Sequence, residues 1–327
     1  MPEMGIVDAV RDALAFEMAR DERVLVLGED VGGAGGVFRA TDGLQQTFGT
    51  GRVFDMPLGE SAIIGSALGL ALSGLVPVAE MQFMGFTHNA FNQITQQLAR
   101  IRYRSYGSLS AQVTVRAPYG GGVRAPEMHS DGFEAHFVHC PGLKIVAPAT
   151  PADARGLLLS AIRDPDPVLF LEPLRGYRLI RGEVPQGDVT VPIGVARVVV
   201  PGSDCTVIAW SAAVEVAKKA AELAAAEGIA AEVIDIRSLV PLDLDTIAAS
   251  VTKTGRVVVV QEASYTGGFA AELIATIQEH ESMFFSLKAP LVRVCGPDTP
   301  YPVQMLEEAY LVNPARVLRA IRKVTRN

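Results

Sequence analysis

Apolar positions along the first half of the chain recur at two different periods. Spacings of three and four residues, which predict helices, run over residues 6–19, 61–72, 89–103 and 151–162. Short apolar runs, which predict buried strands, lie at 24–27, 53–54, 76–81, 113–116, 144–147 and 168–171. Short apolar strands between amphipathic helices predict a parallel sheet that is covered by helices on both faces.

A second unit of the same kind follows a stretch that has no clear period. Strand-like runs lie at 205–210, 231–236, 256–261 and 291–294, and helical spacings lie at 213–227, 244–252, 269–279 and 314–322. Gly182, Pro185 and Gly187 punctuate the stretch before this unit, as is typical of a linker. We therefore predict an α/β chain with two three-layer α/β/α domains and mainly parallel sheets. The domains would cover residues 1–180 and 193–327, with a linker at 181–192.

One uncharged run, at residues 61–79, has about the length of a membrane span. Glu60 and Glu80 flank it, where a membrane span would place lysine, arginine or aromatic residues. Pro77 and several serines and glycines also interrupt it. We interpret the run as a buried helix, a turn at Ser73 and Gly74, and a buried strand, and we expect no membrane segment.

Composition narrows the function class. The 327 residues are 49% hydrophobic and 20% charged, with a net charge of -7, so the chain can bury a large core. It has no basic cluster, and we expect no nucleic-acid partner. Cys140, Cys205 and Cys295 lie far apart, which argues against a disulfide framework or zinc site and fits a reducing cytoplasm. The first residues lack the pattern of a secretory signal.

The common nucleotide motifs are missing, so the candidate chemistry lies in polar residues that follow strands. The glycines at 33 and 35 have no third glycine at the dinucleotide spacing, and no P-loop lysine motif occurs. Glu60 precedes an apolar helix. It either compensates the helix dipole or is a carboxyl group in an apolar pocket with a raised pKa, able to share a proton with a ligand nitrogen.

Two further segments follow predicted strands. Gln82 and Phe86 lie just beyond the strand at 76–81, where a ligand ring could be hydrogen-bonded and stacked. Residues 116–137 form a polar, glycine-rich loop that is too long for a simple connector. His129 lies in this loop and is the histidine best placed for proton transfer. Three of the five histidines lie within eleven residues, but no acid or cysteine spacing completes a metal cluster.

Taken together, nine segments resemble the beta subunit of thiamine-diphosphate-dependent 2-oxo acid dehydrogenases, a family that includes the pyruvate, branched-chain and acetoin enzymes. The segments occur in the family's order and span the chain. They are residues 28–31 (GEDV), 36–39 (GVFR), 57–60 (PLGE), 79–83 (AEMQF), 116–120 (RAPYG), 129–130 (HS), 139–144 (HCPGLK), 170–173 (FLEP) and 298–302 (DTPYP).

The resemblance implies a transketolase-type fold, with a pyrimidine-binding domain first and a transketolase C-terminal domain second. Thiamine diphosphate would lie between this chain and an alpha subunit, which would hold magnesium and the diphosphate through a Gly-Asp-Gly…Asn signature that this sequence lacks. The partners implied are that alpha subunit, in an alpha2-beta2 assembly, and a lipoyl acyltransferase core. The reaction implied is oxidative decarboxylation of a 2-oxo acid, with transfer of the acyl group to a lipoyl arm.

Residue by residue, Glu60 matches the family's glutamate that bonds the aminopyrimidine nitrogen, and His129 matches a histidine that assists acyl transfer. Gln82 and Phe86 match pyrimidine contacts, and Leu58 and Glu29 match neighbours of the cofactor. Phe86 stands where branched-chain members often have tyrosine. Some members also hold potassium, and the matching positions are Ala111, Val113, Thr114, Ala161, Asp164 and Asp166. An ordinary acidic turn at 164–167 is the alternative interpretation of the last two.

Other functions remain open at this point. A single-chain transketolase relative would need the magnesium signature and several hundred more residues. A non-catalytic assembly subunit would be marked by loss of the Glu60 equivalent, which is present. For the substrate, the 79–83 segment favours branched-chain 2-oxo acids, with pyruvate or acetoin as the alternatives.

Overall fold

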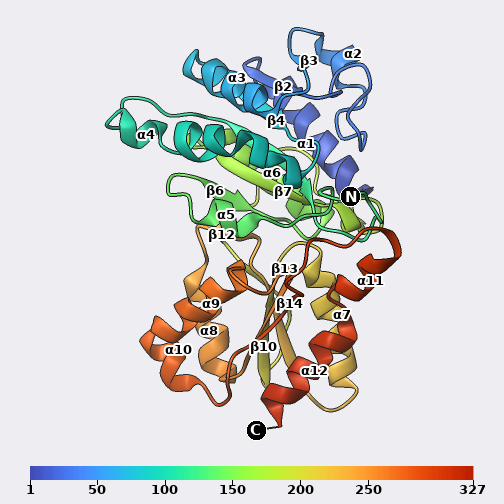
Figure 1. The fold of residues 1–327 in the computed structure, drawn as a ribbon, viewed down its shortest axis with the longest axis vertical. Coiled ribbons are helices and arrows are strands. Elements are labelled where there is room, and N and C mark those ends of the chain that lie inside the picture. The colour runs from blue at the N-terminus through green and yellow to red at the C-terminus, as the bar shows by residue number, and fades with distance from the viewer. Residues whose placement is uncertain (327) are drawn as a thin grey trace.

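The computed structural model describes residues 1–326, which form two α/β units stacked along the long axis of the molecule (Figure 1). The first unit contains the strands β1 (Glu3–Gly5), β2 (Val24–Gly28), β3 (Val53–Asp55), β4 (Val76–Glu80), β5 (Thr114–Tyr119), β6 (Lys144–Val146), β7 (Val168–Pro173) and β8 (Arg181–Glu183). Its helices are α1 (Ile6–Arg20), α2 (Leu44–Phe48), α3 (Glu60–Leu72), α4 (Ile101–Arg104), α5 (Glu134–Val138) and α6 (Pro151–Arg163), with the short helices η1 (Met84–Ala90), η2 (Gln93–Leu98) and η3 (Leu174–Gly176).

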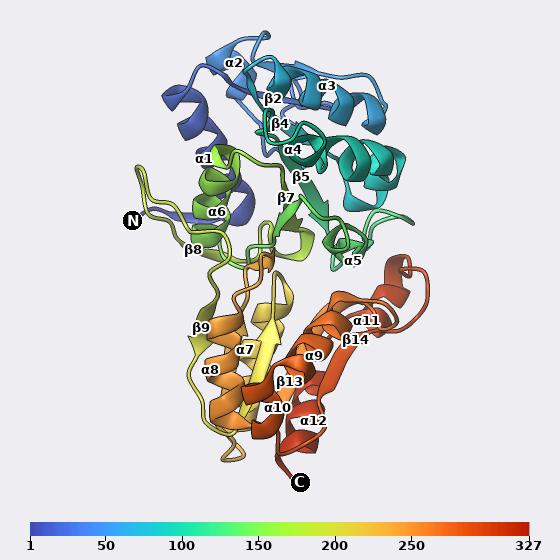
Figure 2. The same cartoon turned by 90° about the vertical axis from the view of Figure 1, so that its left-hand side faces the viewer.

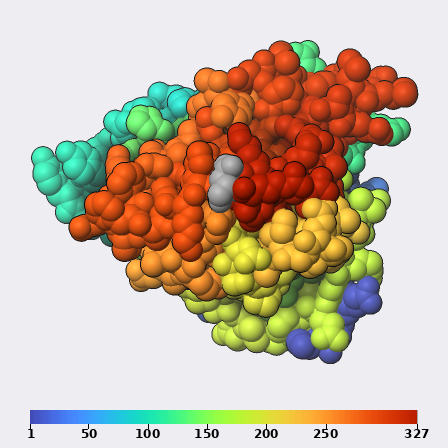
Figure 3. Space-filling model, turned by 90° about the horizontal axis from the view of Figure 1, so that it is seen from below, coloured from blue at the N-terminus to red at the C-terminus, as the bar shows by residue number. Residues whose placement is uncertain are grey.

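The second unit repeats the alternation of strand and helix. Its strands are β9 (Arg197–Val200), β10 (Cys205–Ala209), β11 (Ala231–Asp235), β12 (Ser238–Val240), β13 (Val257–Ser264) and β14 (Val292–Gly296). Its helices are α7 (Ala213–Ala225), α8 (Leu244–Thr254), α9 (Phe269–Glu279), α10 (Glu281–Ser286), η4 (Gln304–Leu306), α11 (Glu307–Tyr310) and α12 (Pro314–Thr325). At the far end of the molecule, α12 packs against α7 (Figure 3).

Both large sheets are mainly parallel, which confirms the predicted fold class. The seven-stranded sheet has the order β12-β6-β7-β5-β4-β2-β3, and only the edge strand β12 runs antiparallel. The five-stranded sheet has the order β14-β13-β10-β11-β9, with β9 antiparallel. Figure 2 shows α1 and α6 on one side of the first sheet and α3 and α4 on the other. The carboxyl ends of β2, β3, β4 and β5 therefore meet at one edge of the sheet.

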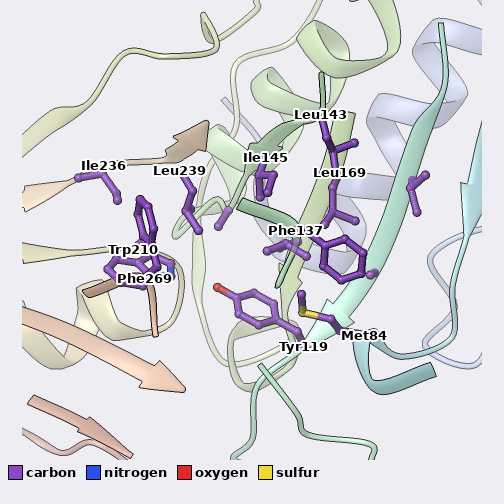
Figure 4. Packing of buried hydrophobic residues seen from close by; sticks show 14 of the residues in the cluster. Met84, Tyr119, Phe137, Leu143, Ile145, Leu169, Trp210, Ile236, Leu239 and Phe269 are labelled. Atoms are coloured by element: carbon purple, nitrogen blue, oxygen red, sulfur yellow. The ribbon is translucent and has the colours of Figure 1, made fainter. Parts of the chain in front are cut away.

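The two units share a continuous apolar core. Phe137 and Leu169 of the first unit belong to the same buried cluster as Trp210 and Phe269 of the second, with Leu239 between them (Figure 4). The strand β12 also crosses the junction, because it follows β11 of the second sheet and pairs with β6 of the first. A shared core and a shared strand make the junction a packed interface rather than a flexible hinge.

Three expectations from the sequence need correction. The single helix predicted at 89–103 is instead a 3-10 helix, a π-helical turn and a short α-helix in succession. The helix predicted to be buried, α3, buries only Ile63, Ile64 and Ala67, so its other side is open. The strand β8 lies inside the predicted linker and pairs with β1, a contact too distant in sequence for periodicity to reveal. Among residues 1–326, no helix is long and apolar enough to span a membrane.

Candidate functional site

The residues expected to bind a cofactor gather beyond the carboxyl ends of β2, β3 and β4. Glu29 follows β2 directly and is only 6% exposed. Glu60 begins α3 and is half-buried, whereas Leu58, two residues earlier, is 85% exposed. Burial raises the pKa of Glu29, and the neighbouring charge of Glu60 raises it further. The two carboxyl groups therefore interact at the rim of the sheet.

Backbone and amide groups orient both carboxyl groups. The Gly59 N–H donates to Glu29, whose other oxygen, Oε1, is buried with no partner among the described residues. Asn89, from the end of η1, donates its Nδ2 hydrogen to Glu60 Oε2 across 3.2 Å. Among residues 1–326 this hydrogen bond occupies Oε2 of Glu60, which leaves Oε1 to accept a ligand. Asn89 is a site residue that its sequence position did not reveal, because its partner lies 29 residues away.

Gln82, Phe86 and His129 form the neighbouring part of the rim. Gln82 Nε2 lies 3.5 Å from Asp30 Oδ2, next to Glu29 in the chain. The His129 ring lies against the rings of Phe83 and Phe86, with centroid distances of 4.4 and 5.0 Å. The structure thus brings these three predicted residues to one edge of the sheet.

The protonation pattern of His129 follows from its hydrogen bond. Its Nδ1 atom lies 2.8 Å from the carbonyl oxygen of Glu127, and a carbonyl can only accept, so Nδ1 carries the hydrogen. In the neutral ring Nε2 then has a free lone pair. His136 and His139 do not join His129. His136 instead lies 3.1 Å from Nε2 of His88, through its Nδ1 atom.

A buried ionic network lies next to this rim. Arg116, in β5, is fully buried and bonds Glu80 Oε2 at 2.6 Å. Its Nε and Nη2 atoms bond both oxygens of Glu172, in β7, at 2.6 and 2.9 Å. The Tyr177 hydroxyl also donates to Glu172. Burial raises the pKa of Glu80, although Arg116 opposes the rise. The network ties three neighbouring strands together near their carboxyl ends.

The six positions implied for potassium lie at the opposite edge of the sheet, near the amino ends of β5 and β7. Both Asp164 oxygens bond Lys144 Nζ, at 2.7 and 2.6 Å, and Asp166 bonds Arg102 at 2.5 Å. Thr114 Oγ1 is buried and has no partner among the described residues. This set is therefore separate from the cofactor rim. Within residues 1–326, no group of three or more His, Cys, Asp or Glu side chains could hold a metal ion.

The chain is similar to known proteins along nearly its whole length. Residues 3–178 match the family model "Transketolase, pyrimidine binding domain", and residues 194–317 match "Transketolase, C-terminal domain". The chain is 50% identical over 324 residues to the beta subunit of the pyruvate dehydrogenase E1 component of Bacillus subtilis (strain 168), covering 99% of each chain. The protein of the same name from Staphylococcus epidermidis (strain ATCC 12228 / FDA PCI 1200) is 49% identical over 313 residues, covering 96% of each.

A solved structure extends the similarity to the fold. The chain described as "Split gene transketolase, inactive beta4 tetramer" matches with a TM-score of 0.80 and 25% sequence identity. The match covers 99% of this chain and 98% of that one.

Proposed function

Because this chain belongs to the family of thiamine-diphosphate-dependent 2-oxo acid dehydrogenase beta subunits, we propose that it supplies the pyrimidine end of a cofactor site that an alpha subunit completes. The rim at the carboxyl ends of β2, β3 and β4 supports this proposal. Glu60 is held there by Asn89 with one carboxyl oxygen left open. Leu58, two residues before Glu60, is 85% exposed and would be covered by the alpha subunit.

The family's cofactor, when bound, supplies an electron sink for decarboxylation. The residues of this chain bind and orient it. Glu60 would share a proton between its carboxyl group and the aminopyrimidine ring nitrogen. Glu29 lies beside it, and burial together with the charge of Glu60 raises the pKa of Glu29. Gln82 and Phe86 would hydrogen-bond and stack against the same ring. Phe86 has no hydroxyl group, so it would act by contact alone.

His129 would serve the later acyl transfer. Acyl transfer would break the S–S bond of the oxidised lipoyl group, which is the two-electron oxidant of the step: one sulfur takes the acyl group and the other leaves as a thiolate that must gain a proton. The Nε2 lone pair of His129 can accept a proton and pass it to that sulfur. The aromatic rings of Phe83 and Phe86 hold the imidazole in place. The acyltransferase core that carries the lipoyl arm is thus a proposed partner.

Pyruvate is the substrate that we propose first, because the relatives at 49–50% identity carry its name. The sequence of the 79–83 segment favours branched-chain 2-oxo acids, which remain the second candidate. The test is reconstitution with the cognate alpha subunit, thiamine diphosphate and magnesium. We expect cofactor-dependent release of carbon dioxide from pyruvate at a higher kcat/KM than from 3-methyl-2-oxobutanoate, and none from this chain alone. Release by this chain alone, or equal rates without the cofactor, would contradict the proposal.

Metal ions would bind at two separate sites. Magnesium would be held by the alpha subunit, beside the diphosphate. The sheet edge at the amino ends of β5 and β7 fits potassium only in part. The Thr114 hydroxyl has no partner among the described residues and could coordinate it. The carbonyl groups of Ala111, Val113 and Ala161 each already accept one backbone hydrogen bond and could use only their second lone pair, and the Asp164 and Asp166 carboxylates are paired with cations. If potassium binds, the Tm of the assembly should be higher in potassium chloride than in an equal concentration of choline chloride.

A non-catalytic assembly role is the remaining alternative, and substitution of Glu60 separates it from the catalytic one.

The three cysteines are free thiols, which fits the cytoplasm as the proposed compartment.

A further inference from the structure

The loop that carries His129 is anchored by a carboxylate from the C-terminal domain. Glu307 begins α11 and is only 2% exposed. Its Oε1 atom accepts a hydrogen bond from the Gly122 N–H at 2.7 Å, and its Oε2 atom accepts one from the Arg124 N–H at 3.0 Å. In Figure 1, α11 lies on the side of the lower domain that faces the junction.

The backbone of the loop is shaped to receive this carboxylate. Gly122 has a φ of 89° and Arg124 a φ of 53°, both in the left-handed region. Left-handed residues alternating with ordinary ones turn successive N–H groups into one concavity, which binds anions. Arg124 adopts this conformation although it has a Cβ atom, which costs free energy that the contacts to Glu307 help to offset.

A second carboxylate from the same domain bonds the residue that precedes Gly122. Glu262, near the end of β13, accepts a hydrogen bond from the Gly121 N–H at 2.5 Å. A Cβ atom on Gly121 would lie 1.6 Å from the Tyr301 hydroxyl oxygen and 2.6 Å from Glu307 Oε1. The loop therefore needs glycine here to approach the C-terminal domain so closely.

The other end of the loop forms part of the proposed site. A Cβ atom on Gly85 would lie 1.9 Å from the Met128 carbonyl oxygen, so η1 and the loop are in backbone contact. His129 follows and packs against Phe83 and Phe86. Only four residues separate the Arg124 N–H that Glu307 binds from the His129 ring.

From these contacts we infer that Glu307 is a positioning residue for acyl transfer, because it fixes the loop that presents His129. This role rests on the proposed function of His129 and deepens it. A residue of the C-terminal domain would then determine the position of His129 in the pyrimidine-binding domain. Decarboxylation, which relies on Glu60 on a different segment, should depend on Glu307 much less.

The test compares Glu307→Gln with Glu308→Gln in the assembly reconstituted with the alpha subunit. A glutamine amide has one acceptor oxygen, so Glu307→Gln loses one of the two backbone hydrogen bonds. Glu308, the control, has a side chain that is 70% exposed, and within residues 1–326 its bond is to the Arg124 side chain, at 2.7 Å. Two rates are measured with the same substrate: reduction of an artificial electron acceptor, which needs no lipoyl group, and acylation of an isolated lipoyl domain.

We expect Glu307→Gln to slow lipoyl acylation by roughly tenfold or more while the artificial-acceptor rate falls less than about threefold. Amide hydrogen exchange in residues 120–129, measured without cofactor, should quicken by about tenfold, as expected when a hydrogen bond to a charged group is lost. Glu308→Gln should change neither of the two rates nor the hydrogen exchange of the loop. Equal falls in both rates, or an unchanged acylation rate, would overturn the inference.

Two further outcomes are distinguished. If Glu307→Gln fails to assemble, Glu307→Asp takes its place, because it keeps the charge but shortens the side chain, and the same ratio of rates decides. If the unmodified assembly shows no decarboxylation with any 2-oxo acid, the proposed function has failed. In that case faster exchange of the loop in Glu307→Gln would still support the anchor, and unchanged exchange would overturn it.

Discussion

At the residue scale, the partners of a charged side chain decide its role, and sequence spacing predicts those partners poorly. Glu60 could be singled out because it follows a strand-like run and precedes an apolar helix. Arg116 could not, because its carboxylate partners lie 36 and 56 residues away. The same holds for Asn89, which orients Glu60. The sequence thus predicted Glu60 as a candidate site residue, but not the residue that orients it.

The buried arginine yields a stability prediction. Replacing Arg116 with leucine leaves Glu80 and Glu172 buried without their cation, which typically costs about 3–5 kcal/mol. The Tm should fall by on the order of 10 °C in thermal unfolding followed by circular dichroism. Arg102→Leu is the matched control, since its ion pair with Asp166 is partly exposed and should contribute about 1 kcal/mol at most. A similar Tm for the two variants would contradict this view of the network.

At the element scale, strongly periodic segments were predicted well and close backbone contacts were not. The helix α6, with a proline at its start and a Thr150 cap, begins at the predicted residue. One helix was predicted over residues 89–103, yet the chain forms three short helices between residues 84 and 104. Gly85 lies against the Met128 carbonyl in this region, and that contact with the loop is absent from any local pattern.

Gly85 therefore tests whether η1 and the loop depend on close approach. Its replacement by alanine would place a Cβ atom 1.9 Å from the Met128 oxygen, so the loop must shift, at a cost of about 1–3 kcal/mol. Gly69→Ala, in α3, has open space around it and should be neutral or stabilising by up to about 1 kcal/mol. Thermal unfolding of both variants checks this difference. Equal Tm values would show that the loop yields without strain.

At the scale of the whole molecule, the domain junction carries features that no local pattern indicates. The two-domain α/β fold followed from the alternation of strands and helices. The strand β12 nevertheless crosses into the other sheet, and Glu134, Glu262 and Glu307 converge on the junction from distant segments. Periodicity reports which face of an element is buried, but not which distant element covers it.

The junction predicts a pH dependence. Burial raises the pKa of Glu134 from 4.5 to about 7, and the charge of Glu262 contributes to the rise. The folded state therefore holds this proton more tightly than the unfolded state. The resulting stabilisation is fully present below about pH 4.5 and is lost as the pH rises to about 7.

Glu134→Gln, which stays neutral, should consequently gain stability over the unmodified chain as the pH rises. The gain at pH 8 should exceed that at pH 5.5 by on the order of 2 kcal/mol, measured by denaturant unfolding at both values. Exposed Glu272→Gln serves as the control and should show the same small difference at both pH values. A pH-independent effect of Glu134→Gln would mean that the carboxyl group is ionised in the folded chain.

The central claim is that this chain supplies the pyrimidine end of the cofactor site through Glu60. Its most direct test is the thiamine-diphosphate-dependent decarboxylation rate of Glu60→Gln after reconstitution with the alpha subunit, with exposed Glu22→Gln as control. We predict a fall in kcat of at least about 100-fold for Glu60→Gln, with assembly intact, and no change for the control. Full activity of Glu60→Gln would contradict the claim and favour a non-catalytic assembly role.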